Sequence, residues 1–109
     1  MTPTLTTKTK AAKDGDLEAA QSTALVRALN ALAREWSECA DRADDPEVED
    51  MRRRSTAQLR FVAVLTASGP GYFELGIAWA IAGRRMLDAA NLADMDAVYE
   101  SRRLRRGVL

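Results

Sequence analysis

Residues 61–83 read FVAVLTASGPGYFELGIAWAIAG, and Glu74 is the one charged residue among them. An apolar stretch of this length is a candidate for a membrane-spanning helix, a buried core element or an interface. The Ser-Gly-Pro-Gly sequence at 68–71 divides it, because glycine permits a turn and proline cannot donate a backbone hydrogen bond. Neither remaining part reaches the roughly 20 residues that cross a bilayer. The stretch therefore predicts the end of one helix, a corner and the start of another helix.

The sequence before this stretch predicts a helical hairpin. Apolar residues recur at spacings of three and four from Leu17 to Ala43, which predicts a long amphipathic helix over about residues 16–43. Asp45 can cap a second helix over about 46–67, and Pro46 suits its first position. Because the connection between the two helices is very short, we expect them to be antiparallel.

The sequence after the corner predicts two further helices, one over about residues 71–90 and a short basic one over about 94–106, with a break near Asn91 and Asp94. Residues 1–15 are polar and aperiodic, and we expect a flexible basic arm there. The predicted fold class is therefore all-α: a single domain over 16–109, a small helical bundle built on a long antiparallel hairpin, with a central apolar third helix.

The rare residue types restrict the chemistry. The chain has no histidine and one cysteine, Cys39. Without imidazole there is no Ser-His-Asp or Cys-His pairing, and a lone cysteine cannot make a zinc site of the usual Cys/His kind. We therefore expect no enzyme, no cofactor, no metal and no small-molecule substrate. Cys39 lies on the apolar stripe and is expected to be a buried small residue. The absence of disulfides and of an apolar signal region favours a cytoplasmic location.

The third predicted helix is apolar on nearly all sides, which indicates burial on more than one side. Its own chain could cover all of them, as the central helix of a bundle, or a second chain could cover some. The first hypothesis is therefore a non-enzymatic interaction or assembly module whose partner is a second copy or another helical protein. The predicted interface residues are Phe73, Gly76, Ile77, Trp79, Ala80, Ile81, Gly83 and Met86.

Two arginine clusters support a second hypothesis, a nucleic-acid-associated accessory or regulatory protein. Acids stand four residues before Arg53 and Arg54, a spacing that favours ion pairs along the helix. The C-terminal cluster has fewer neighbouring acids. The candidate anion-binding residues are Arg52, Arg53, Arg54, Arg102, Arg103, Arg105 and Arg106. A membrane-active hairpin is a further alternative, which Glu74 and the Gly-Pro-Gly corner disfavour. The excess of arginine over lysine, with many alanines, suggests a bacterial or phage origin.

Overall fold

The computed structural model describes the backbone of residues 2–108 and the side chains of residues 17–107. It contains three α-helices, α1 (Thr2–Asp41), α2 (Pro46–Ser68) and α3 (Phe73–Val108), and no strand occurs within residues 2–108. A single 3-10 turn, η1 (Pro70–Tyr72), joins α2 to α3. The all-α prediction is therefore confirmed.

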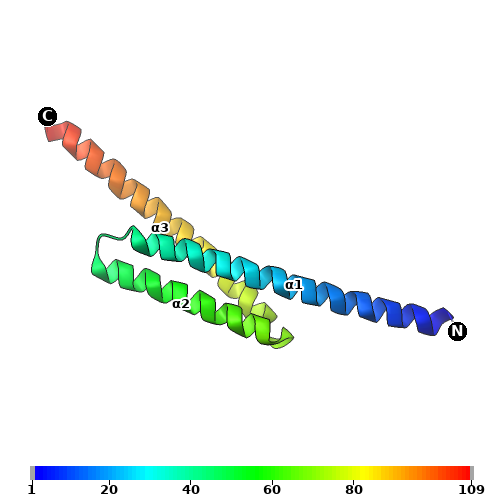
Figure 1. Cartoon of the computed structure of the whole chain (residues 1–109). Helices are drawn as coiled ribbons and strands as arrows, with labels where there is room; N and C mark the ends of the chain where they lie inside the picture. Colours follow the sequence, from blue (N-terminus) through cyan, green and yellow to red (C-terminus); the bar gives the residue numbers. More distant parts are fainter. Residues whose placement is uncertain (1, 109) are drawn as a thin grey trace.

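Helices α1 and α2 form the antiparallel hairpin that the sequence predicts (Figure 1). The start of α2 is fixed by Asp45, whose side chain accepts a hydrogen bond of 2.8 Å from the backbone N–H of Glu47. Pro46 occupies the first turn, where no intrahelical partner for a backbone N–H exists. The two acidic residues Glu47 and Glu49 in this turn complement the positive end of the helix dipole.

Helix α3 lies across the hairpin and contacts both of its helices (Figure 1). The Gly-Pro-Gly corner reverses the chain through η1, so that the first half of α3 returns along α2. The second half continues past the hairpin turn and ends far from it, while the N-terminal end of α1 projects in the opposite direction. No helix within residues 2–108 is long and apolar enough to cross a lipid bilayer.

The core lies where the three helices meet. Its largest fully buried side chains come one from each helix, Leu29, Leu59 and Leu87, and Trp36 fills the space beside them. Cys39 is buried in this core, as predicted. Its side chain packs among apolar neighbours, where it acts as a small hydrophobic residue.

Two sequence-based expectations differ from the structure. The prediction of a separate fourth helix was wrong, because α3 continues without a break through Asn91 and Asp94. Both residues use their side chains for contacts to the hairpin, and neither glycine nor proline interrupts the helix there. The expected arm at 1–15 is helical from Thr2 onward as part of α1. Its predicted flexibility remains a prediction, and its side chains lie outside the described ones.

The two projecting helix ends make the chain elongated. Its principal extents are 85 × 23 × 15 Å, and the radius of gyration is 20.8 Å. A compact domain of 100 residues has a radius of gyration of about 13 Å. The two projecting helix ends therefore extend well beyond the single core.

Candidate interaction surface

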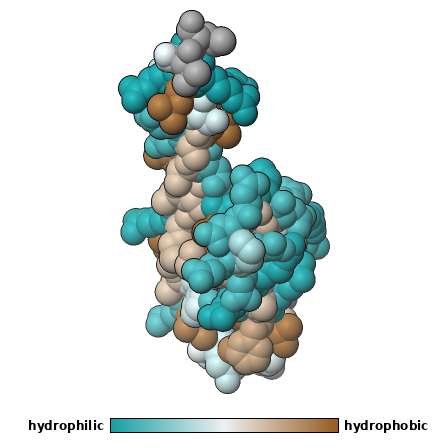
Figure 2. Space-filling view, turned by 90° about the vertical axis from the view of Figure 1, so that its left-hand side faces the viewer, coloured by the Kyte–Doolittle hydropathy of each residue, from teal (hydrophilic) through white to brown (hydrophobic). Residues whose placement is uncertain are grey.

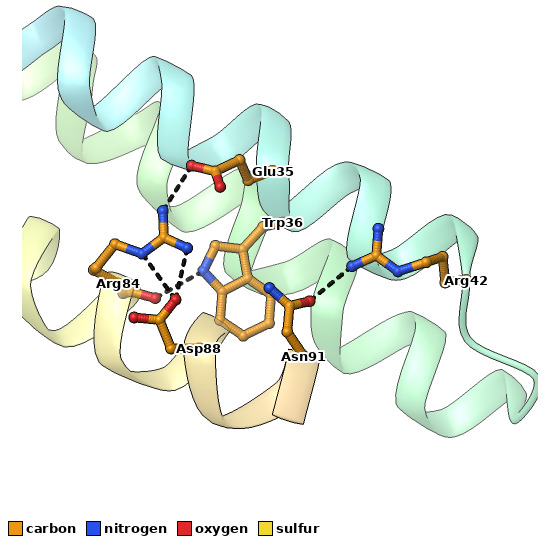
Figure 3. A network of polar contacts seen from close by, with 7 residues as sticks. Glu35, Trp36, Arg42, Arg84, Asp88 and Asn91 are labelled. Atoms are coloured by element: carbon orange, nitrogen blue, oxygen red, sulfur yellow. Dashed lines mark hydrogen bonds and ion pairs between the residues drawn. The ribbon is translucent and has the colours of Figure 1, made fainter. Parts of the chain in front are cut away.

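Two glycines of α3 let the helix approach the hairpin closely. A Cβ atom at Gly76 would stand 2.6 Å from the hydroxyl of Thr66, and one at Gly83 would stand 2.9 Å from a methyl group of Leu32. The carbonyl oxygen of Gly83 also accepts a 3.1 Å hydrogen bond from the indole N–H of Trp36 (Figure 3). The first half of α3 is therefore held against its own hairpin by close packing.

Polar contacts extend this attachment along the α1 side of α3 (Figure 3). Arg84 donates to Glu35 of α1 at 2.8 Å and to Asp88 of its own helix at 2.7 Å. The hydrogen bonds to Asp88 and Glu35 raise the pKa of Arg84 above its usual value, so the guanidinium stays charged. Two turns further on, Arg42 donates to the side-chain oxygen of Asn91 at 2.7 Å.

A partly buried ion pair marks the end of the attachment. Arg52 of α2 is 6% exposed and donates two hydrogen bonds, of 2.8 and 3.1 Å, to the carboxylate of Asp94. It also donates to the backbone carbonyl of Cys39 at 2.9 Å. The hydrogen bond to Asp94 raises the pKa of Arg52 above its usual value. All three helices therefore meet at this guanidinium.

Beyond Asp94, α3 leaves the hairpin. Every residue from Met95 to Gly107 is exposed, and we call this segment the overhang. Its 13 residues extend about 20 Å. It carries large apolar side chains in the open, with Met95 and Tyr99 each 68% exposed. Figure 2 shows the overhang standing clear of the hairpin, with hydrophobic patches among the hydrophilic side chains of its outer end, whereas the turn end of the hairpin is mostly hydrophilic.

Two open grooves flank the base of the overhang. The side groove, of about 580 Å³, lies between the end of α1 and α3, and its floor includes Met95, Val98 and Tyr99. The turn groove, of about 720 Å³, lies between the hairpin turn and α3, with Asp44 and Asp45 on one wall and Arg105 on the other. The side groove has the more apolar lining, so it suits a helix that presents apolar side chains.

The structure divides the predicted interface residues into two groups. Gly76 and Gly83 are buried against the hairpin, and Trp79 and Ala80 are half-buried against its core. The side of α3 that carries Gly76 and Gly83 thus packs against helices of its own chain and is not a free surface. Phe73 is half-buried, whereas the others, Ile77, Ile81 and Met86, are exposed.

The structure also divides the predicted anion-binding arginines into two groups, one on α2 and one on the overhang. Arg52 is enclosed by its pair with Asp94, and Arg53 and Arg54 bind carboxylates within 3.0 Å. The overhang carries the other four, of which Arg103 pairs with Glu100 at 3.2 Å. Within the part of the chain whose side chains are described, Arg102, Arg105 and Arg106 form no ion pair. The two clusters therefore do not form one basic surface.

The exposed apolar residues of the overhang, which carry this surface, were missed at the sequence level. The signal that could have found them is the spacing of Leu92, Met95 and Tyr99, which continues the helical pattern past the predicted break. Among the described residues, no group of three or more acidic or cysteine side chains is placed to hold a metal ion. No protein-family model matches the chain, and neither a curated protein nor a solved structure is detectably similar to it.

Proposed function

We propose that this chain is a non-enzymatic interaction module that self-associates through α3. The observation that carries the proposal is the overhang, a helical segment whose apolar side chains no other described part of the chain covers. Contiguous exposed apolar surface on a protein of this kind marks an interaction site. We place the contact in the second half of α3, because the hairpin already covers one face of the first half and no described part of the chain covers the second half.

The physics of short helices supports the same conclusion. A helix of about 13 residues without tertiary contacts is marginal in water, since most helical stability comes from packing of an apolar face. The overhang is anchored at one end by the pair of Arg52 with Asp94, but its outer turns have no such support. A partner that covers the apolar side chains would stabilise these turns. The proposal retains the expectation of a cytoplasmic location.

A second candidate function rests on the three exposed arginines of the overhang that form no ion pair among the described side chains. Arg102, Arg105 and Arg106 could contact phosphates. Three cations give weak, salt-sensitive binding, and the arginines of α2 are already occupied by carboxylates. Nucleic-acid binding therefore remains the alternative rather than the conclusion.

The test is light scattering coupled to size exclusion, with absorbance read at 260 and 280 nm. The chain has a mass of 12.0 kDa, and we expect a species of twice this mass at high micromolar concentration. Tyr99→Glu places a charge on the overhang and should yield a monomer. The matched control is Phe61→Glu on α2, because Phe61 is 63% exposed and Tyr99 is 68% exposed. This control variant should remain a dimer.

Two outcomes would contradict the proposal. A wild-type chain that stays monomeric throughout the concentration range would exclude self-association. Co-elution with nucleic acid, seen as excess absorbance at 260 nm and lost on raising the salt concentration, would favour the second function. Circular dichroism of both variants checks that the helices are intact.

A further inference from the structure

A heptad pattern runs along the exposed side of α3. Residues separated alternately by four and three positions fall on one stripe, which is the spacing of a coiled-coil seam. We call this stripe the seam, and it consists of Asp88, Leu92, Met95, Tyr99, Arg102 and Arg106. All six residues are exposed, and three of them, Leu92, Met95 and Tyr99, are large and mainly apolar. The seam begins beside the hairpin and continues to the last turns of the overhang.

The charges at the two ends of the seam differ in sign. Asp88, which also pairs with Arg84 of its own helix, stands at the N-terminal end, and Arg102 and Arg106 stand at the C-terminal end. If two copies paired in parallel, each end of the seam would lie beside the same end of the other copy. Like charges would then be held side by side, which is destabilising. If the copies paired antiparallel, each acidic end would meet a basic end. Charge complementarity therefore selects the antiparallel arrangement for a second copy of this chain.

We infer that two copies pair antiparallel along the seam, about a two-fold axis beside Ala97. This inference rests on the proposed self-association and specifies its geometry. With the axis at Ala97, Asp88 stands opposite the partner's Arg106, and Met95 stands opposite the partner's Tyr99. Leu92 packs beside the aliphatic part of the partner's Arg102, which can extend its guanidinium to solvent. A single register therefore brings the apolar side chains of the two copies together and places residues of opposite charge next to each other.

The surroundings of the seam fit this occupant. The partner helix would lie in the side groove, against Met95, Val98 and Tyr99. The adjoining face of α1 carries Glu35 and Glu38 on the same side as Arg42, because residues three and four apart share a helix face. Glu35 already pairs with Arg84, so Glu38 is the exposed acid of this face that the partner's basic end would approach. The paired segment is only about 28 Å long, which predicts a weak, micromolar dimer.

Distance measurement between spin labels tests the direction of pairing in the full chain. Gly107→Cys places a label outside the seam, where nothing lies within 4 Å of an added Cβ atom. In the antiparallel dimer the two labels are separated by about 30 Å along the helix axis alone. In a parallel dimer they would stand at the same height on neighbouring helices, within about 20 Å. The wild-type chain is the labelling control, because its Cys39 is fully buried.

The outcomes separate this inference from the proposed function. A dimer with the long distance, abolished by Tyr99→Glu, supports the inference. A dimer with the short distance, or one that survives Tyr99→Glu, overturns the antiparallel seam and leaves self-association standing. A chain that is monomeric by light scattering overturns both.

Discussion

At the scale of single residues, the guanidinium of Arg52 carries the largest structural consequence. Its side chain is 8% exposed, whereas that of Asp94 is 35% exposed. The charge is tolerated in this position because the carboxylate accepts two hydrogen bonds from it and the carbonyl of Cys39 accepts a third. An arginine that lost this carboxylate would keep its charge in a poorly solvated position.

Asp94→Ala should therefore lower the free energy of unfolding by about 2 kcal/mol, the value for removing one partner of a charged hydrogen bond that is largely shielded from water. Urea denaturation followed by circular dichroism measures this change. The matched control is Asp50→Ala, which removes the exposed i,i+4 pair with Arg54. It should change stability by less than about 0.5 kcal/mol. Equal effects of the two substitutions would show that Arg52 is not specially placed.

Gly76 gives the second prediction at this scale. Thr66 is 2% exposed, and its hydroxyl donates to the carbonyl of Val62 at 2.8 Å, so it has little freedom to move away from an added methyl group. Alanine favours helix over glycine by about 1 kcal/mol, but overpacking costs about 1–3 kcal/mol. Gly76→Ala should therefore be net destabilising by about 1 kcal/mol in thermal or urea unfolding.

The same substitution at Gly107 is the control for Gly76→Ala. No atom lies within 4 Å of an added Cβ at Gly107, so Gly107→Ala should be neutral or slightly stabilising. If Gly76→Ala were also stabilising, α3 would not approach the hairpin as closely as described.

Local rules predicted the short-range contacts of these residues and failed for the long-range ones. The spacing of acid before base predicted the pairs of Glu49 with Arg53 and of Asp50 with Arg54, and both are confirmed. The partner of Arg52 stands 42 positions away, on a helix whose placement depends on the Gly-Pro-Gly corner. No pattern within one helix contains that information.

At the scale of the helices, the difference in length between α1 and α2 decides which apolar side chains of α1 are buried. The apolar stripe of α1 begins at Leu17, yet Leu17 is 58% exposed, whereas Leu29 is fully buried. Helix α2 has 23 residues and α1 has 40, so α2 covers only the C-terminal half of α1. The sequence predicted the face of α1 that points inward. The sequence could not predict how far along this face α2 would extend.

The continuity of α3 was the main error at this scale, and it has a physical cause. Asn91 and Asp94 are poor helix formers and common caps, which is why a break was expected there. In the structure Arg42 and Arg52 bind their side chains, so neither side chain competes with the backbone. Tertiary contacts thus overrode the local preference and produced the overhang.

Proline substitutions should distinguish the packed half of α3 from the overhang. Ala82→Pro and Ser101→Pro both replace an exposed residue within the same helix. Proline in a packed helix costs about 3 kcal/mol, so Ala82→Pro should severely destabilise the fold. Ser101→Pro should cost much less, because the turns around it contribute little packing, but it should abolish self-association.

Urea unfolding and light scattering of these two proline variants measure both effects. A large loss of stability in Ser101→Pro would mean that the overhang is part of the core, contrary to its full exposure. Retained association in that variant would place the contact elsewhere on the molecule.

At the scale of the whole molecule, charge is arranged in blocks that a second copy can satisfy. The formal net charge is zero, yet the segment from residue 14 to residue 50 is strongly acidic, and residues 102–106 hold four arginines. Within one chain Arg102 and Arg105 face Asp44 and Asp45 only across the open turn groove, and no ion pair joins them. Antiparallel pairing would return basic ends to acidic surroundings. Self-association stays a prediction from the apolarity of α3, and the folded hairpin adds which part of α3 its own chain covers.

Charge reversal at the ends of the seam tests the proposed register. Arg106→Glu alone would oppose two acids at each end of the dimer, and Asp88→Arg alone would oppose two cations. Each single variant should weaken dimerisation roughly three- to tenfold, the effect expected for two exposed pairs. The double variant, Asp88→Arg with Arg106→Glu, restores opposite charges and should recover most of the affinity, as measured by sedimentation equilibrium. Arg84 loses its partner Asp88 in two of these variants but keeps its pair with Glu35. Urea unfolding measures the resulting change in the stability of the single chain, so that it can be separated from the change in dimerisation. Additive weakening in the double variant would show that these two residues do not meet across the dimer.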